Sequence, residues 1–343
     1  MKILSNQPIT ASAPGKLMLS VGYAVVHGFS TVVTAVDQRL MATVKKNGSG
    51  WFYLQAPDLG LTNYSKKIAV LGNGHVPKSV QFIEIVYKHF LEKFPQQEGI
   101  SVSTKSEFST SYGFGSSSAV TVAFAKALTT LYDVNLSKKE LFDLTYRVIL
   151  EVQGVGSGYD LAAAIWGGTL RYVKPAKTIA QLKLREPKLL VVFTGEKADT
   201  PTLIRMVNSL YERQPAKIKV IFEEINEIAF SLEKSLAIGD WSTVGKLFCR
   251  SQQAARELGV SSTRIEELIE IAQATGAYGA TCSGAGGGDC VLVAVADQQR
   301  AAVKKALRQA GAKILSVQLD APGVRIEKAR WKKPPLEPPV TWP

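Results

Sequence analysis

The stretch GATCSGAGGGDCVLVAV, residues 279–295, places four glycines and an aspartate between two apolar segments. A β-turn needs one or two glycines, whereas Gly284 and Gly286–Gly288 fall within a single short loop. Glycine lets the backbone approach a neighbouring group closely because it has no side chain. The stretch therefore predicts a loop whose backbone lies close to a ligand, followed by a strand that begins after Asp289.

A second glycine-rich segment, YGFGSSSAV at residues 112–120, runs into an apolar, alanine-rich helical segment. A glycine-rich loop at a helix N-terminus presents unpaired backbone N–H groups and the positive end of the helix dipole, which suits a polyphosphate. The hydroxyls of Ser116, Ser117 and Ser118 are candidates for holding a phosphate or Mg²⁺. The segment lacks the lysine of the GxxxxGK[ST] loop, and a tight strand-to-helix turn is the alternative.

Two shorter motifs carry one charged residue each. Lys16 ends APGK in an apolar segment, where it either lies near an anion or carboxylate or is an exposed turn lysine. Asp160 follows a Gly-Ser-Gly turn in GSGYDLAAAIWGG and begins an apolar helix. It either complements the helix dipole or is an active-site carboxylate paired with a distant lysine.

The net charge of +12 comes from 41 Lys+Arg against 29 Asp+Glu. These basic residues are scattered, which disfavours a nucleic-acid partner and leaves an anionic small substrate or a solvated basic surface. The three cysteines have neither CxxC spacing nor a partnering histidine cluster, which indicates a reducing compartment without a structural metal. No apolar run reaches the ~18 residues of a membrane span, and no signal-peptide segment is present. We therefore expect a cytoplasmic protein without a membrane partner.

The residue pattern changes near residue 185, from mixed strands and helices to a half dominated by helices. Two helix starts are predicted from side chains: Ser79 as an N-cap, and Ser137 with Glu140 as a capping box. Later helices are predicted over 201–213, 215–238, 240–258, 261–275 and 297–311. The predicted domains are an N-terminal domain over 1–185, a C-terminal domain over 186–325 and a proline-rich tail over 326–343.

The order of these motifs is more specific than any one of them. APGK, GFGSSSA, GSGYD and SGAGGGD, in this order and spacing, resemble the superfamily of galactokinases, homoserine kinases, mevalonate kinases and phosphomevalonate kinases, the GHMP kinases. The resemblance extends to about residue 325. It implies an α+β, two-domain fold, with an N-terminal domain like ribosomal protein S5 and a ferredoxin-like C-terminal domain. ATP and the acceptor are then expected between the domains.

Local details favour the phosphomevalonate kinases within this superfamily. VGYAVVHG, GSGYDLAAAIWGGTLRYVK, FTGEKADT and SGAGGGDC are similar to the corresponding segments of those enzymes. Ser111 stands where the family's phosphate loop usually has a lysine, and Gly22 where mevalonate kinases commonly have glutamate. The resemblance implies phosphorylation of 5-phosphomevalonate to 5-diphosphomevalonate in isoprenoid biosynthesis. The alternative is a mevalonate kinase or another GHMP kinase that acts on an alcohol or sugar.

The resemblance also implies roles for individual residues, with ATP and Mg²⁺ as cofactors. Lys16 would stabilise the charge of the transferred phosphoryl group. A phosphomonoester is already an anionic nucleophile, so Asp160 would mainly orient Lys16 and the acceptor. The ATP phosphates would lie on Gly113, Gly115, Ser116, Ser117 and Ser118, with Ser117 on Mg²⁺. The expected acceptor contacts are Tyr23, Ser157, Arg171, Lys174, Lys197, Thr200, Gly286, Gly287, Gly288 and Asp289. The oligomeric state is left open, a homodimer included.

Overall fold

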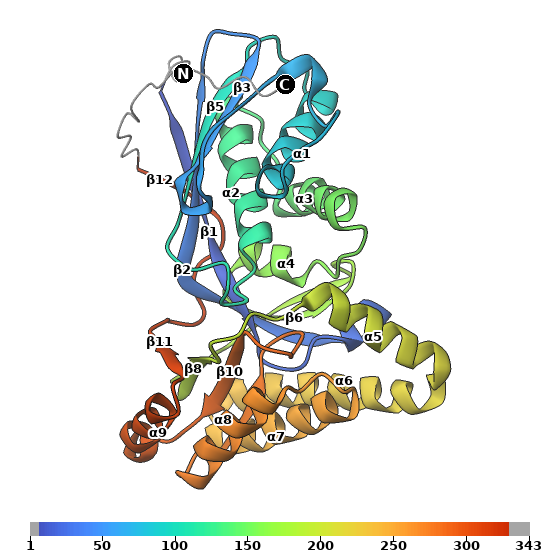
Figure 1. The fold of residues 1–343 in the computed structure, drawn as a ribbon, viewed down its shortest axis with the longest axis vertical. Helices are drawn as coiled ribbons and strands as arrows, with labels where there is room; N and C mark the ends of the chain where they lie inside the picture. Colours follow the sequence, from blue (N-terminus) through green and yellow to red (C-terminus); the bar gives the residue numbers. More distant parts are fainter. Residues whose placement is uncertain (1–6, 329–343) are drawn as a thin grey trace.

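The computed structural model describes residues 7–328 and contains two antiparallel-rich sheets with helices packed on them (Figure 1). The larger sheet has eight strands in the order β12-β1-β2-β5-β3-β4, with β6 also pairing with β2 and β7 with β6. Its strands are β1 (Ile9–Met18), β2 (Thr31–Lys46), β3 (Trp51–Ala56), β4 (Leu61–Lys67), β5 (Ile100–Ser106), β6 (Thr169–Val173), β7 (Thr178–Leu182) and β12 (Arg325–Glu327).

Four helices cover one face of this sheet: α1 (Lys78–Lys93), α2 (Ser116–Leu131), α3 (Lys138–Gln153) and α4 (Tyr159–Trp166) (Figure 1). The alanine-rich α2 packs directly on β1 and β2, because its small side chains let the helix approach the strands closely. Large aromatic side chains such as Phe52, Phe90 and Phe124 fill the space between sheet and helices and are fully buried. The start of α2 is thereby held at one end of β1.

The second sheet has the order β11-β8-β10-β9, and all of its strands are antiparallel. In chain order this is 4-1-3-2, with helices after the first strand and between the third and the fourth, which is a ferredoxin-like arrangement with extra helices. The predicted α+β fold is confirmed. Its elements are β8 (Leu189–Phe193), α5 (Thr200–Arg213), α6 (Pro215–Ile238), α7 (Trp241–Glu257), α8 (Thr263–Ala274), β9 (Gly279–Cys282), β10 (Cys290–Ala294), α9 (Asp297–Gln309) and β11 (Lys313–Leu315).

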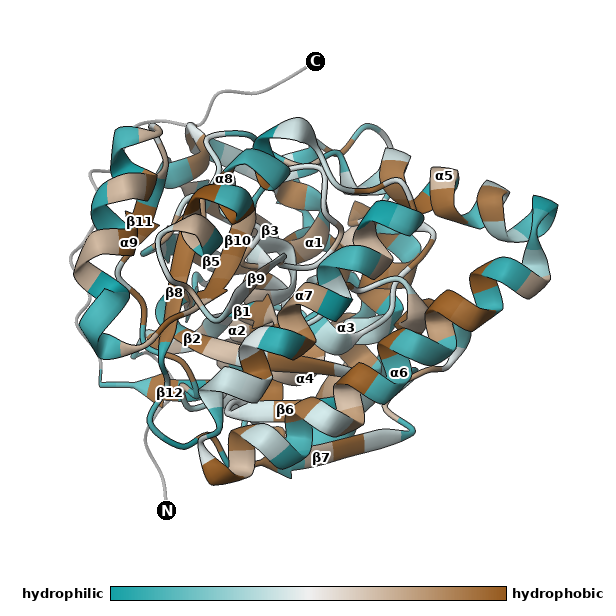
Figure 2. Ribbon diagram, turned by 90° about the horizontal axis from the view of Figure 1, so that it is seen from below, coloured by the Kyte–Doolittle hydropathy of each residue, from teal (hydrophilic) through white to brown (hydrophobic). Residues whose placement is uncertain are grey.

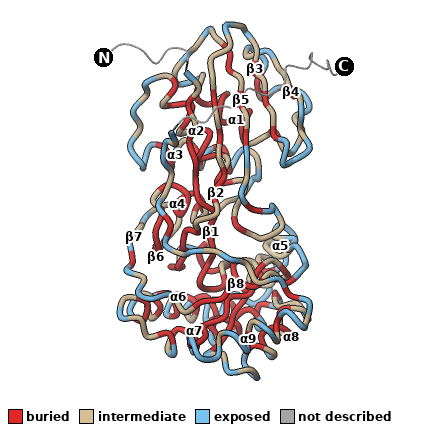
Figure 3. The backbone as a smooth tube through the Cα atoms, turned by 90° about the vertical axis from the view of Figure 1, so that its left-hand side faces the viewer, coloured by how far each residue is buried: buried red, intermediate tan, exposed pale blue. Residues whose placement is uncertain are grey.

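The two sheets share a hydrophobic core. One buried cluster joins Leu17 and Val33 of the larger sheet to Trp241, Phe248 and Leu292 of the smaller sheet and its helices. Figure 3 shows buried segments continuing from β1 and β2 to β8 and α7. Three short 3-10 helices complete the described elements: Ala24–His27, Pro57–Leu59 and Ile68–Val70. Among the described helices, none combines the length and apolar character that crossing a membrane requires.

The structure tests the predicted helix starts and shows where the chain changes sheets. Ser137 and Glu140 form the predicted capping box of α3. The prediction of Ser79 as an N-cap is wrong: α1 begins one residue earlier, and the Pro77 carbonyl accepts the Val80 N–H at 2.8 Å. The first sheet's β7 ends at Leu182 and the second sheet begins at Leu189, while β12 returns to pair with β1. Most of the predicted tail, residues 329–343, lies outside the described residues.

Candidate functional site

Lys16 is positioned by a break in strand register. β1 and β2 pair antiparallel, and their register shifts between Pro14 and Gly15, directly before Lys16. Such irregularities bend a strand and redirect the side chains that follow. Gly15 lies against Phe114, since a Cβ at Gly15 would be 3.1 Å from the Phe114 Cβ. Lys16 is tied to the loop before α2: its N–H donates to the Phe114 carbonyl (3.0 Å) and its Nζ to the Gly113 carbonyl (2.9 Å).

Asp160 faces Lys16 from the first turn of α4, with its Oδ1 3.3 Å from Lys16 Nζ. Gly158 precedes α4 with a φ of +87°, and a Cβ there would be 2.6 Å from the Tyr172 hydroxyl. Within residues 7–328 the buried Asp160 Oδ1 accepts no hydrogen bond, while the side chain as a whole is 30% exposed. The carboxylate is therefore paired with Lys16 through a buried oxygen and remains open on its other side.

The surrounding charges keep Lys16 protonated. Burial alone lowers the pKa of Lys16, but the Asp160 carboxylate, with smaller contributions from Tyr159 and Asp289, outweighs burial and holds this pKa above its usual value. The Lys16 ammonium also lies 5.3 Å from the centre of the Tyr159 ring. Lys16 is only 8% exposed, so its charge acts in a partly desolvated site, where electrostatic interactions are stronger than in water.

The loop before α2 brings backbone N–H groups next to this pair. Gly113 and Gly115 have φ values of +70° and +73°, a conformation that favours glycine. Gly115 is the N-cap of α2 and provides no side-chain cap, so the N–H groups of the first helical turn lack a capping side chain. A Cβ at Gly115 would lie 3.2 Å from Lys16 Cε. The predicted phosphate loop and the predicted Lys16–Asp160 pair are therefore adjacent.

Asp289 brings a second carboxylate to the same loop. Its φ of +56° is unusual for a residue other than glycine, although aspartate tolerates it better than most. Its Oδ1 accepts the Ala198 N–H at 3.0 Å, and a Cβ at Gly113 would lie 2.5 Å from its Oδ2. Burial raises the pKa of Asp289, while the Ala198 N–H and the charges of Lys16 and Lys197 counteract burial in part.

The glycines before Asp289 contact backbone from separate parts of the chain. The Gly284 carbonyl accepts the Gly22 N–H at 3.0 Å, and the Gly287 N–H donates to the Val260 carbonyl at 2.7 Å. Cβ atoms at Gly286 and Gly288 would meet the Val260 carbonyl at 2.3 Å and the Glu196 carbonyl at 2.9 Å. The repeated glycines thus allow one loop to pack against β1's exit, the α7–α8 turn and the β8–α5 loop.

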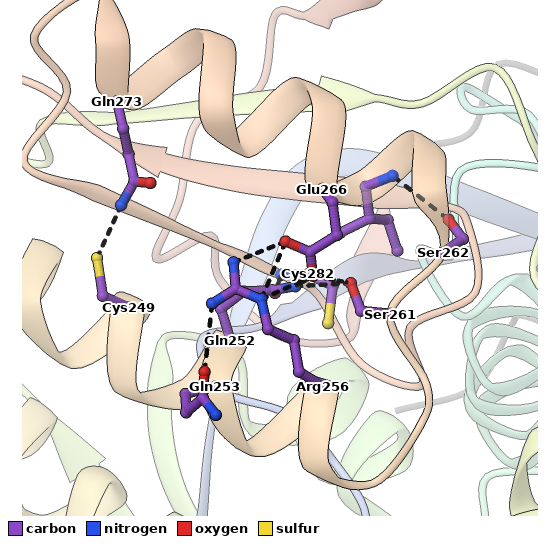
Figure 4. Close-up of polar contacts among 10 residues, drawn as sticks. Cys249, Gln252, Gln253, Arg256, Ser261, Ser262, Glu266, Gln273 and Cys282 are labelled. Carbon is purple, nitrogen blue, oxygen red and sulfur yellow. Dashed lines mark hydrogen bonds and ion pairs between the residues drawn. The ribbon is translucent and has the colours of Figure 1, made fainter.

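A polar network holds the segments that flank this glycine-rich loop, namely the end of β9 and the α7–α8 turn (Figure 4). Gln252 is buried; its Oε1 accepts the Cys282 N–H at 3.0 Å, and its Nε2 donates to Ser261 and Glu266. Arg256 Nη2 donates to Glu266 at 2.6 Å. Burial tends to raise the pKa of Glu266, but hydrogen bonds from Arg256, Ser261 and Gln252 hold it below its usual value. The network joins α7, α8 and the end of β9, and it fixes the turn that carries Val260.

Some predicted acceptor contacts lie elsewhere or are already engaged. The Arg171 side chain turns toward α6, where its Nε donates to Glu233 at 2.6 Å and its guanidinium lies 4.5 Å from the Phe230 ring centre. Buried Tyr23 donates its hydroxyl to the Ala285 carbonyl at 2.7 Å, so it braces the glycine-rich loop. Arg171, predicted as an acceptor contact, is therefore paired with Glu233 in this structure.

The other predicted contacts lie in loops or at the ends of elements: after β6, before α4 and between β8 and α5. Lys174 lies near His27, whose pKa is lowered by burial first and by the Lys174 charge second. Ser157, before α4, accepts the Tyr172 hydroxyl through its carbonyl at 2.7 Å. Lys197 is exposed near Asp289, and Thr200 is the first residue of α5.

Sequence reasoning missed several residues that shape the site. Tyr159 carries the ring under Lys16, and Ser283 Oγ both accepts the Met18 N–H and donates to the Met18 carbonyl. Tyr112 accepts a hydrogen bond from Lys313 and packs against Phe193, which connects the phosphate loop to the second sheet. Only Tyr159 has a signal in the sequence, because it stands directly before Asp160 in the motif GSGYD. The other contacts join residues far apart in sequence.

The oxygen donors near the loop suit Mg²⁺ delivered with ATP. In residues 7–328 no group of three or more His, Cys, Asp or Glu side chains is arranged to hold a metal ion. Mg²⁺ bound to nucleotide phosphates needs only one or two protein oxygens, together with water and phosphate. Ser117 in the first turn of α2 and the carboxylates of Asp160 and Asp289 are oxygen ligands of the required type.

Comparisons with known proteins show the family of the chain and agree with its fold. The family models described as GHMP kinases N terminal domain and GHMP kinases C terminal match residues 81–168 and 232–313. A protein named mevalonate kinase from Pyrococcus abyssi is 31% identical and covers 94% of this chain and 98% of its own length. The fold is similar to the Methanococcus jannaschii mevalonate kinase structure (TM-score 0.77, 23% identity, 92% and 98% coverage). It is also similar to Streptococcus pneumoniae phosphomevalonate kinase bound to phosphomevalonate and AMPPNP (TM-score 0.74, 20% identity, 91% and 99% coverage). The chain belongs to the GHMP kinase family.

Proposed function

We propose that this kinase transfers the γ-phosphoryl group of ATP to the hydroxyl of mevalonate. The observation that carries the proposal is the partly buried Lys16–Asp160 pair, 3.3 Å apart, beside a glycine loop at a helix N-terminus. An alcohol is almost fully protonated at neutral pH, so its phosphorylation benefits from a base. Asp160 offers a carboxylate that is partly exposed and not neutralised by a bidentate cation. The Pyrococcus relative's name supports the same acceptor.

Each part of phosphoryl transfer has a candidate residue. The backbone N–H groups of 113–118 would hold the ATP phosphates, and Lys16 would stabilise the charge that develops on the transferred group. Asp160 would accept the proton of the attacking hydroxyl. Mg²⁺, held in part by Ser117, would neutralise phosphate charge. The glycine-rich loop 284–288 would form the wall on the acceptor side.

Phosphomevalonate is the second candidate acceptor, and the geometry supports it less. A phosphorylated acceptor carries extra negative charge and calls for additional cations near the pair. Arg171, the strongest candidate by sequence, is neutralised by Glu233. Two observations still favour phosphomevalonate: Lys197 is exposed near Asp289, and the segment SGAGGGDC is similar to the corresponding segment of phosphomevalonate kinases.

The direct test is ADP release by the purified protein with Mg-ATP and, in turn, mevalonate, phosphomevalonate, diphosphomevalonate, galactose and homoserine. We expect turnover with mevalonate. Turnover with phosphomevalonate alone replaces the proposed acceptor but retains the kinase assignment. Activity with galactose or homoserine alone contradicts both mevalonate-pathway acceptors.

The role of Asp160 gives an independent test of the acceptor. With mevalonate, Asp160→Asn removes the base, and we expect kcat to fall by about 10²–10⁴. With a phosphomonoester the same change removes only orientation of Lys16, so a loss below about tenfold would favour phosphomevalonate. Tight binding of an ATP analogue by the variant serves as the control for an intact phosphate loop.

A further inference from the structure

A cavity of about 550 Å³ lies at the edge of the second sheet, between α9 and the strands β8 and β11. Its lining comes from residues around Leu189–Val191, from one side of α9 and from residues 314–319. None of the residues of the Lys16–Asp160 site lines it. The volume is within the range of cavities that bind small molecules. Figure 1 places α9 and β11 at the lower left, away from α4.

One wall of the cavity is cationic. Arg300, Lys304 and Arg308 occur at intervals of four residues, so they share one side of α9 along two helical turns. Within residues 7–328 none of the three forms an ion pair; the acidic residue of α9, Asp297, pairs with Lys188 instead. Arg300 donates to the Leu189 carbonyl at 2.9 Å, whereas Lys304 and Arg308 have no carboxylate partner in the part of the chain that the structure describes.

The opposite wall is aliphatic. Ile314, Leu315, Val317 and Leu319 are only partly buried, although each packs against a hydrophobic core. Their strand ends at Leu315 and the chain then leaves β8, which opens the apolar surface beside α9. Figure 2 shows the hydrophilic segments of α9 beside this sheet edge. Asp37 Oδ1 accepts the Gln318 N–H at 2.8 Å beside this wall.

These two walls specify a class of ligand. A phosphate has the charge to match several cations, and an aliphatic chain matches the aliphatic wall. Among residues 7–328 no aromatic side chain lines the cavity, so none of the described residues there stacks on a nucleobase. We propose that this cavity binds an aliphatic phosphate, with its head on Lys304 and Arg308 and its chain against Leu315 and Val317. This site is separate from the kinase site.

The test uses decyl phosphate as the probe, below the concentration at which it forms micelles, and isothermal titration calorimetry on the full chain. We expect saturable binding at one site, and binding of inorganic phosphate at least about tenfold weaker because it lacks the buried chain. The variant Lys304→Gln/Arg308→Gln should bind decyl phosphate about tenfold more weakly, from the loss of two partly exposed charge contacts.

A charge-matched control separates this site from general surface attraction. Lys246 and Lys305 are exposed and do not line the cavity, so Lys246→Gln/Lys305→Gln should leave decyl phosphate affinity unchanged. Saturating AMPPNP with Mg²⁺ should also leave it unchanged. The proposal is overturned if decyl phosphate does not bind, if the control pair weakens binding as much as the cavity pair, or if AMPPNP displaces the probe. Circular dichroism melting of both variants verifies that they fold.

Discussion

In the loop before α2, a Cβ at Gly113 or Gly115 would meet the side chains of Asp289 or Lys16; in the loop before β10, a Cβ at Gly286 would meet the carbonyl of Val260. Glycine in the first loop leaves room for charged groups of the site. Glycine in the second loop leaves room for neighbouring backbone. The same residue type therefore serves chemistry in one loop and architecture in the other, and substitutions should separate the two uses.

The largest effect is expected at Lys16, the charged residue against which the first loop is built. Lys16→Met removes a buried cation close to the proposed transfer site, and we expect kcat to fall about 10³-fold. Steady-state ADP release measures this loss, with Lys305→Met as a control that removes an exposed lysine. Retention of a tenth of the wild-type kcat would show that Lys16 is not needed for transfer.

Gly286→Ala tests the second loop, residues 284–288 before β10, which we call the architectural loop. The residue has a φ of +73°, and the new Cβ would lie 2.3 Å from the Val260 carbonyl, which belongs to backbone and cannot rotate away. Conformational strain and overpacking together should lower the free energy of unfolding by about 3 kcal/mol. Urea denaturation measures it. Gly48→Ala is the matched control: its φ is +67°, and nothing lies within 4 Å of the new Cβ, so only the strain of about 1 kcal/mol should appear. Equal losses at the two positions would contradict the packing argument.

Gly113→Ala tests the first loop, residues 113–115 before α2, which we call the chemical loop. Gly48→Ala is again the control. The Gly113 φ of +70° makes the backbone strain comparable to that at Gly48, but the new Cβ would meet Asp289 Oδ2 at 2.5 Å. Asp289 Oδ2 can rotate away, but Asp289 Cβ would lie 2.9 Å from the new Cβ and is fixed by its backbone. We therefore expect a stability loss above that of the control and below that of Gly286→Ala, together with displacement of the proposed phosphate loop. We expect KM for ATP to rise about tenfold, equivalent to about 1.4 kcal/mol. An unchanged KM alongside a large stability loss would make Gly113 architectural as well.

Sequence reasoning succeeded where the determining contacts are local. The capping box of Ser137 and Glu140 spans one helical turn, and the glycines and serines of 113–118 form a loop that continues into the first turn of α2. The motif order was sufficient to indicate the family and the α+β fold. The sequence also suggested that Asp160 pairs with a distant lysine, and the structure brings Lys16 to 3.3 Å from it.

Sequence reasoning was wrong at one helix start and gave no signal for contacts between residues that are far apart along the chain. Arg171 is an expected acceptor contact, and its pairing with Glu233 of α6, 62 residues further along the chain, has no signal in the motif. Ser79 is predicted as an N-cap, but Pro77 occupies the N-cap position two residues earlier and Lys78 begins the helix. The packing of Gly286 on Val260 depends on the position of the α7–α8 turn, and no sequence motif predicts that position.

Glu266 provides the smallest predicted effect and tests whether the network of Figure 4 supports the architectural loop. The pKa of Glu266 is held below its usual value in the folded protein, so its charged form stabilises the fold above pH about 4.3, and this contribution declines as the pH falls through the lowered pKa. Glu266→Gln should therefore lower the free energy of unfolding by about 1 kcal/mol at pH 7, a modest value because Arg256 is 43% exposed. The difference from wild type should shrink toward pH 3, as measured by urea denaturation across pH. Because Gln252 still holds Cys282 in this variant, KM for ATP should stay unchanged. If the loss of unfolding free energy in the variant is the same at every pH, the effect comes from packing, and the ionised carboxylate does not stabilise this loop.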